Sequence, residues 1–123
     1  MDRRQFCVSG AFGLALGASS VRDALAGQPL VSRVIYDSRF GASRAFAVAA
    51  QRRGIRAVAI RGDVTALWRH DLDGHWARAG GAVAGLTTRS SLLCLEQMAR
   101  DHWYQVRTRQ PCADGLISWV IAA

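Results

Sequence analysis

The side chains best suited to chemistry follow three short apolar segments of the chain. These segments are Val31–Tyr36, Ala57–Ile60 and Ala82–Leu86, and the polar residues after them are Asp37, Ser38, Arg39, Asp63, Thr87, Thr88 and Arg89. Carboxylates, hydroxyls and guanidinium groups gathered in one place bind small polar or anionic ligands. Ligands in open parallel sheets bind beyond the carboxyl ends of the strands, so these residues form the predicted site if the segments are parallel strands.

Helix capping competes with this interpretation. Asp and Thr side chains accept hydrogen bonds at the start of helices, and Asp63 and Thr88 suit that role. Asp37 and Arg39 are the best candidates for a ligand role, because Ser43 is the better predicted cap for the helix that follows them.

A second polar cluster brings two histidines and two aspartates together between residues 70 and 75. Such side chains bind metal ions, and a metal here would take His70, Asp73 and His75 as ligands. The spacing matches no zinc or EF-hand pattern, so a hydrophilic turn is the favoured explanation. The dinucleotide fingerprint and the P-loop are both missing from the sequence, and no cofactor is predicted.

Cys94 and Cys112 are the only cysteines beyond residue 26. In an oxidising compartment they could form a disulfide, and closing a loop of this size stabilises a fold by roughly 3 kcal/mol. The alternative is that Cys94, on the apolar face of a helix, is buried as a small hydrophobic residue.

The chain has 4 tryptophans, which is many for its length. Packing in the core is the default role for such residues. Trp76 and Trp103 lie in the less regular stretches and are the better candidates for exposed anchors on a partner protein.

Apolar periodicity predicts alternating strands and helices. Two further strands are expected at Tyr104–Thr108 and Leu116–Ile121, and helices at Ser43–Arg53, from Val64 to Leu72 and from about Ser90 to Arg100. Gly54 should end the first helix, Gly74 should break any helix after Asp71, and Ala57–Ile60 should be covered on both faces. The order β-α-β-α-β-α-β-β predicts an α/β fold, a small three-layer Rossmann-like or flavodoxin-like sandwich with a C-terminal antiparallel hairpin.

Residues 1–26 are predicted to be a cleavable export signal, and residues 27–123 a single small α/β domain. Arg3, Arg4 and Phe6 open the segment, and a short, glycine-diluted apolar core follows. Ala24 and Ala26 suit signal peptidase. The start resembles the twin-arginine signal family, which implies that the Tat translocase exports the protein already folded, often with a cofactor or partner. Cleavage would leave a periplasmic protein with no membrane anchor, whereas an uncleaved signal would tether it to the inner membrane.

The net charge of the chain excludes few classes of binding partner. The chain carries 16 basic and 9 acidic residues, a formal net charge of +7, and all of its basic residues are arginine. The arginines are scattered mostly singly and without interleaved aromatic residues, so nucleic-acid binding is not predicted. Attraction to an anionic ligand or acidic partner stays open.

Two functions follow from these observations. The first is a non-enzymatic accessory or binding subunit of a periplasmic redox system, whose partner would be a larger redox enzyme. The second is a small periplasmic enzyme, or a domain that binds an anion or small ligand at the carboxyl ends of the strands. The first is favoured, because no triad or nucleophile elbow stands at a recognisable spacing.

Overall fold

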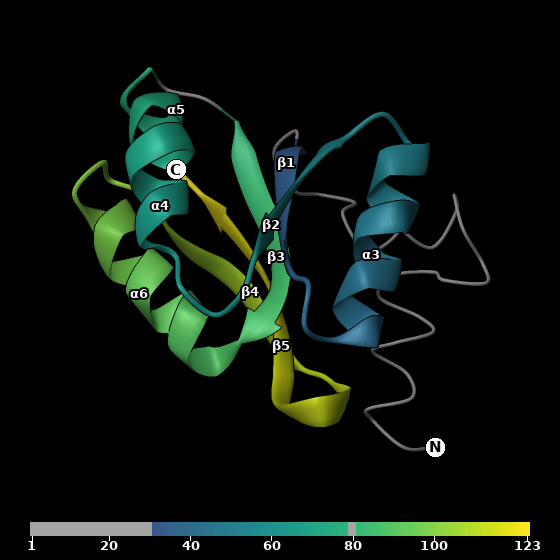
Figure 1. The fold of residues 1–123 in the computed structure, drawn as a ribbon. Helices are drawn as coiled ribbons and strands as arrows, with labels where there is room; N and C mark the ends of the chain where they lie inside the picture. Colours follow the sequence, from purple (N-terminus) through teal and green to yellow (C-terminus); the bar gives the residue numbers. More distant parts are fainter. Residues whose placement is uncertain (1–30, 79–80) are drawn as a thin grey trace.

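The computed structural model describes residues 31–78 and 81–123, without the side chains of Asp73 and Ala77 (Figure 1). The strands are β1 (Val31–Asp37), β2 (Arg56–Ile60), β3 (Ala82–Thr88), β4 (Gln105–Pro111) and β5 (Leu116–Ala122). The helical segments are α3 (Gly41–Arg52), α4 (Thr65–Leu67), the π-helical turn η2 (Trp68–Leu72), α5 (Asp73–Ala77), α6 (Arg89–Arg100) and the 3-10 turn η3 (Ala113–Gly115). The predicted export signal, with Arg3, Arg4, Phe6, Ala24 and Ala26, lies outside the described residues.

The strands form one five-stranded sheet in the order β2-β1-β3-β5-β4. The pairs β1–β2 and β1–β3 are parallel, whereas β3–β5 and β4–β5 are antiparallel. The predicted α/β class and the C-terminal antiparallel hairpin are therefore confirmed. The hairpin places β5 inside the sheet and β4 at its edge, so the two edge strands are β2 and β4.

Helices lie on both faces of the sheet, with α3 on one side and α4, α5 and α6 on the other (Figure 1). On the α3 side, Phe46 and Ala50 pack against Val34, Leu86 and Val120. The larger core on the opposite side contains the following buried residues: Ile35, Ile60, Val64, Leu67, Leu72, Trp76, Val83, Leu92, Leu95, Ala99, Tyr104, Ile117, Trp119 and Ile121.

The start of α3 differs from the prediction. Phe40 occupies the N-cap position without a capping side chain, and Ser43 lies one turn further in, fully buried. The Ser43 hydroxyl accepts the Asp37 N–H at 2.7 Å and donates to the Leu86 carbonyl at 2.5 Å, so it joins the ends of β1 and β3 instead of capping the helix. Gly54, with φ +79°, follows the end of α3 as predicted.

The helical segment after β2 is longer than predicted. It begins at Thr65, passes through the π-helical turn η2 and continues in α5 to Ala77, with Gly74 inside α5. The Arg78 N–H donates to the Gly74 carbonyl at 3.2 Å, so this glycine does not break the helix. The apolar residues Leu67, Leu72 and Trp76 are all buried, and their packing outweighs the modest helix-breaking tendency of one glycine.

Helix α6 has the predicted cap and apolar stripe. The Thr88 hydroxyl accepts the Ser91 N–H at 3.4 Å, and Leu92, Leu95 and Ala99 are buried. Among the described residues, none of the helices has both the length and the apolar character needed to cross a membrane.

Strand β2 was predicted to be covered on both faces, and this is wrong. Only Ile60 of its five residues is buried, while Arg56 and Ala59 are exposed and Ala57 and Val58 are half-buried. The strand pairs with β1 on one side and has no described strand on the other. The same apolar run that suits a central strand therefore lies at an open edge.

Candidate functional site

At the carboxyl end of β1, two predicted site residues, Asp37 and Arg39, form an ion pair. Both carboxylate oxygens of the fully buried Asp37 accept hydrogen bonds from the Arg39 guanidinium, at 2.9 Å from Nε and 2.7 Å from Nη2. The Arg39 N–H also donates to Asp37 at 3.0 Å. Burial alone would raise the pKa of Asp37, but the Arg39 hydrogen bonds and the charges of Arg39 and Arg61 outweigh it and lower the pKa.

Gly62 makes room for this ion pair. A Cβ atom at residue 62 would stand 2.7 Å from Arg39 Nη2, and the backbone there has φ +89°, a conformation that favours glycine. Ser38 donates from its hydroxyl to the Ile60 carbonyl at 3.3 Å. The predicted residues Asp37, Ser38 and Arg39 do lie together, but their strongest polar contacts are with one another and with the neighbouring backbone.

The remaining predicted residues at these strand ends have structural partners or point elsewhere. Thr87 is fully buried and accepts the Trp119 indole N–H at 3.0 Å. Thr88 caps α6, and the Asp63 carboxylate accepts the Thr65 N–H at 2.9 Å, which lowers the pKa of Asp63. Arg89 is exposed at the first position of α6. Most of the predicted set therefore holds the strand ends together.

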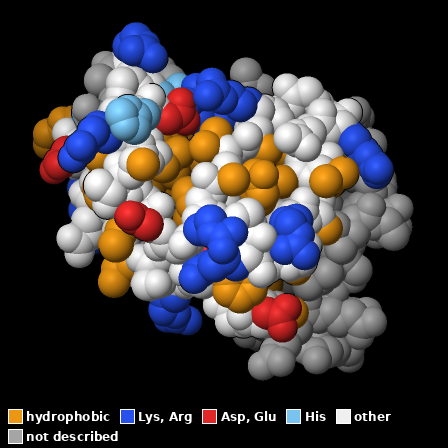
Figure 2. Space-filling view, viewed as in Figure 1, with side chains coloured by type: hydrophobic (Ala, Val, Ile, Leu, Met, Phe, Trp, Pro, Cys, Tyr) orange, Lys and Arg blue, Asp and Glu red, His pale blue; other side chains and the backbone are white. Residues whose placement is uncertain are grey.

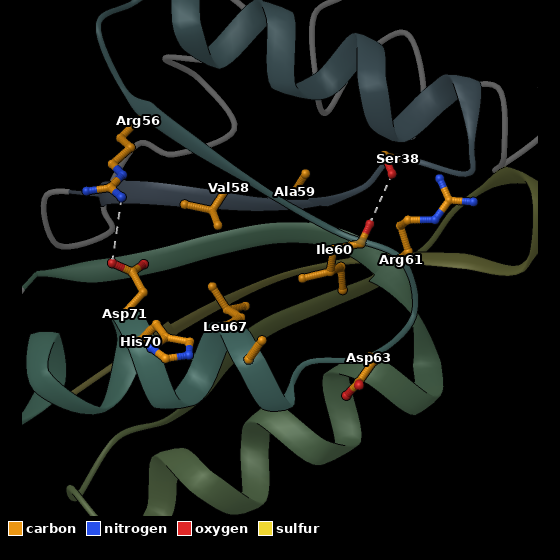
Figure 3. Close-up of a pocket in the computed structure, with 11 residues that line it drawn as sticks. Ser38, Arg56, Val58, Ala59, Ile60, Arg61, Asp63, Leu67, His70 and Asp71 are labelled. Carbon is orange, nitrogen blue, oxygen red and sulfur yellow. Dashed lines mark hydrogen bonds and ion pairs between the residues drawn. The ribbon is translucent and has the colours of Figure 1, made fainter.

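An open groove runs along β2 instead, between this edge strand and the helical segment α4–η2 (Figure 3). We call it the β2 groove, and its volume is about 610 Å³. Its lining residues are Ser38, Arg56, Val58, Ala59, Ile60, Arg61, Asp63, Ala66, Leu67, His70 and Asp71. Hydrophobic side chains occupy the middle of this face of the molecule, with arginines around them (Figure 2).

The two ends of the β2 groove carry charge. At one end, Asp71 pairs with Arg33 and lies 4.0 Å from Arg56 Nη2. At the other end lie Arg61 and Asp63, while Val58 and Leu67 lie between the charged ends (Figure 3). The groove thus combines an apolar middle with charged ends.

The backbone of β2 offers unpaired hydrogen-bonding groups to this groove. The Ile60 carbonyl accepts the Ser38 N–H at 2.9 Å, so Ile60 directs its backbone groups toward the β1 side. Backbone groups alternate sides along a strand, so those of Ala57 and Ala59 face away from β1. No described strand pairs with that side, and Ala59 is exposed.

The two edges of the sheet differ in their protection. Edge strand β4 carries Arg107, Arg109 and Pro111, and its register shifts between Val106 and Thr108. Charged side chains, proline and such irregularities discourage an edge from pairing with another chain. Within β2 only Arg56 offers such protection, and the Ala57–Ile60 run leaves that edge able to accept a strand.

Two of the three predicted metal ligands, His70 and His75, lie in different surroundings. His75 is buried, and its Nε2 lies 2.9 Å from the Ser32 hydroxyl and 3.3 Å from the Gly81 carbonyl, whereas His70 is exposed in the β2 groove. The side chain of Asp73 lies outside the described part of the structure. Among the described side chains, no group of three or more His, Cys, Asp or Glu residues could hold a metal ion.

The predicted disulfide between Cys94 and Cys112 is wrong. Cys94 is an exposed free cysteine on α6, and so it is not buried as a small hydrophobic residue either. Cys112 packs in the core on the α3 side of the sheet. Because α6 covers the opposite face, the sheet separates the two cysteines.

The two tryptophans proposed as anchors have different environments. Trp76 is buried, with its ring 5.4 Å from those of Trp68 and Tyr104, so this part of the prediction is wrong. Trp103 is 89% exposed and has φ +64°, at the turn where the Tyr104 N–H returns to the Ala99 carbonyl. The predicted exposure of Trp103 is thus confirmed, and its role as an anchor on a partner stays a prediction.

Four residues that line the β2 groove are not among the predicted site residues: Arg56, Val58, Arg61 and Leu67. One signal was present, because Ala57–Ile60 lacks charged residues and prolines that would protect an edge. That signal has meaning only once β2 is known to be an edge strand. No protein-family model, no curated protein and no solved structure matches this chain.

Proposed function

We propose that this protein is a non-enzymatic binding subunit that holds an extended segment of a partner protein along the edge of β2. One observation carries the proposal: an unprotected edge strand borders a groove with an apolar middle. Strand addition to such an edge supplies main-chain hydrogen bonds, and the groove supplies pockets for alternate side chains. The β2 groove has about 610 Å³, enough for several side chains of the bound segment.

The proposal includes export to the periplasm and an accessory role beside a larger redox enzyme. Its support is the resemblance of residues 1–8 to twin-arginine signals, which carry folded proteins and their partners. It also includes a flavodoxin-like origin of the domain, since the order β2-β1-β3 is how such sheets begin, although the antiparallel β5 beside β3 departs from that pattern.

An enzymatic role has less support from the geometry. Asp37 and Thr87, the most buried of the predicted site residues, contact Arg39, Ser43 and Trp119 rather than an open cavity. The alternative of a small anionic ligand is favoured by one observation, the exposed Arg61 at the end of the groove near the carboxyl ends of the strands. Titration with inorganic phosphate and citrate, followed by calorimetry, tests that alternative.

A single substitution tests strand addition. Ala59→Pro removes one outward N–H without removing a β1–β2 hydrogen bond, because proline is tolerated where the N–H of an edge strand faces solvent. Ala59→Ser keeps the N–H and serves as the matched control. Peptides selected from a library of random octapeptides on the immobilised protein should bind Ala59→Pro at least about tenfold more weakly, the equivalent of roughly one to two lost hydrogen bonds.

Circular dichroism and urea unfolding must first show that both variants are folded. Equal binding of the selected peptides to Ala59→Pro and Ala59→Ser would refute strand addition at β2. A library that yields no peptide sensitive to the Ala59→Pro change would refute it as well.

A further inference from the structure

We infer that the segment held in the β2 groove is acidic, with a carboxylate that meets Arg61 and an apolar side chain that covers Val58 and Leu67. This inference rests on the proposed function, because it names the chemistry of the partner for that same groove. It follows from which charges of the groove are already paired and which are not.

The two acidic residues of the groove already make contacts within the protein. Asp71 is paired with Arg33 and approached by Arg56, so two guanidinium groups share one carboxylate. The Asp63 carboxylate accepts the Thr65 N–H at 2.9 Å, in the turn that leads into α4. Asp71 is therefore compensated by arginines of the protein, whereas the exposed Asp63 keeps its charge, two residues from Arg61.

Arg61 has no such partner. It is exposed, and within the described residues it forms no ion pair. Its charge contributes to the lowered pKa of Asp37, although these two described side chains form no ion pair with each other, so the guanidinium stays accessible. Arg56 is also accessible, with a side chain 66% exposed and a contact to Asp71 at the 4.0 Å limit of an ion pair. The groove therefore presents two arginines whose capacity to bind carboxylates is largely unused.

The spacing of these arginines sets the length of the segment. Arg56 begins β2 and Arg61 follows its last residue, which places them about 17 Å apart at roughly 3.3 Å per residue. An extended segment of about six residues spans this distance, with an acidic residue near each end. Val58 and Leu67 then face the middle of the segment, where an apolar side chain would be covered (Figure 3).

The charge of the whole chain acts in the same direction. A formal net charge of +7 attracts acidic partners at long range and raises their association rate at low salt. Figure 2 shows arginines on several sides of the apolar middle on this face. A basic segment would meet repulsion from these arginines, and within the described residues it would find only one groove carboxylate without an ion pair, that of Asp63.

Three synthetic peptides of equal length test the inference. Each has valine in the middle and alternating threonine, with glutamate, glutamine or lysine near both ends, and binding to the purified protein is followed by fluorescence anisotropy at 50 and 500 mM salt. The glutamate peptide should bind about tenfold more tightly than the glutamine peptide and the lysine peptide most weakly. High salt should reduce the difference.

Substitutions in the protein test which residue produces the preference for the glutamate peptide. Arg61→Gln should remove most of the advantage of the glutamate peptide, whereas Arg107→Gln, on the opposite edge strand β4, should leave it unchanged. Ala59→Pro should weaken all three peptides, because it removes a backbone contact that does not depend on their charge.

The outcomes separate the inference from the proposed function. Equal affinity for the three peptides, still lost in Ala59→Pro, would overturn the acidic segment and leave strand addition in place. A glutamate advantage that survives Arg61→Gln would overturn the role of Arg61. Peptide affinities that are unchanged in Ala59→Pro would overturn strand addition itself, and with it this inference.

Discussion

Substituting Gly85 by alanine should destabilise the protein severely, although the change adds one methyl group. Gly85 lies in β3 directly opposite Trp119 of β5. A Cβ atom at residue 85 would stand 2.2 Å from Cζ2 and 2.5 Å from Cε2 of the Trp119 indole, which is only 2% exposed. Because both atoms belong to a rigid ring packed in the core, the clash cannot be relieved by a small rotation of a flexible side chain.

The expected magnitude has three parts. Forcing the buried ring aside costs about 1–3 kcal/mol as overpacking. Moving the indole also breaks the 3.0 Å hydrogen bond from Trp119 Nε1 to the Thr87 hydroxyl, and leaving a buried polar group unpaired costs about 1–3 kcal/mol. Alanine regains about 0.5–1 kcal/mol over glycine in a strand. We therefore expect a net loss of about 3 kcal/mol, a large share of the 5–15 kcal/mol typical of natural domains.

Urea unfolding followed by circular dichroism measures this loss, and a double-mutant cycle identifies its cause. Trp119→Ala alone should cost about 3–5 kcal/mol, because it leaves a cavity. In that background Gly85→Ala should be neutral or slightly stabilising, since the ring is gone. If Gly85→Ala fails to fold, the double variant should still fold at least as well as Trp119→Ala. A cost below about 1 kcal/mol, or an equal cost in both backgrounds, would refute the reasoning.

Four further predictions concern the titration of two buried groups, backbone strain and thiol access. Burial opposes ionisation of Asp37, but Arg39 lowers its pKa overall. The ionised carboxylate therefore stabilises the fold above the unfolded-state pKa of about 3.9, and this contribution is lost as the pH falls. Asp37→Asn should flatten the loss of stability in acid. Burial and, to a smaller extent, the Arg33 charge lower the pKa of His75. The stability of the protein should therefore decrease as the pH falls below about 6.5. His75→Gln should remove that decrease, as measured by urea unfolding at several pH values. Trp103→Gly should leave the protein equally stable or stabilise it by about 1 kcal/mol, because glycine relieves the positive φ; a clear loss of stability would show that the indole makes contacts within the fold. Cys94 should react with maleimide in the native protein, and mass spectrometry should locate the label there; slow labelling that requires urea would contradict its exposure.

Much of the fold could be predicted from sequence because local pattern determines the elements. The β-branched runs in β1 and β3, the apolar stripe of α6 and the glycine after α3 each carry their own signal. The order of the strands in the sheet has no such local signal. Alanine and valine in Ala57–Ile60 satisfy both a central and an edge strand, and the choice depends on where the hairpin of β4 and β5 joins the sheet. The burial of β2 was mispredicted for that reason.

The site was harder to predict because one residue type serves several roles. Ser43 has the right identity and position for a cap, but a buried hydroxyl that joins β1 and β3 is equally compatible with the sequence. Asp37 and Arg39 were correctly placed together, yet their proximity in sequence could not show that they would neutralise each other. The β2 groove is lined by residues between positions 38 and 71, and it exists because β2 lies at the edge of the sheet. No local spacing in the sequence encodes that edge position.

The order of the strands explains both the side chains packed at the carboxyl ends of β1 and β3 and the unpaired edge of β2. In sheets of this kind ligands bind at the carboxyl ends of strands, where the order of the strands reverses, which here lies between β1 and β3. Ser43 joins those two strand ends, and Arg39 lies over Gly62 and pairs with Asp37, so the chain's own side chains occupy the usual ligand position. The binding that we propose then falls to polar groups that lack partners within the described residues. The outward backbone of β2 and the guanidinium group of Arg61 are such groups, and they lie along a single groove.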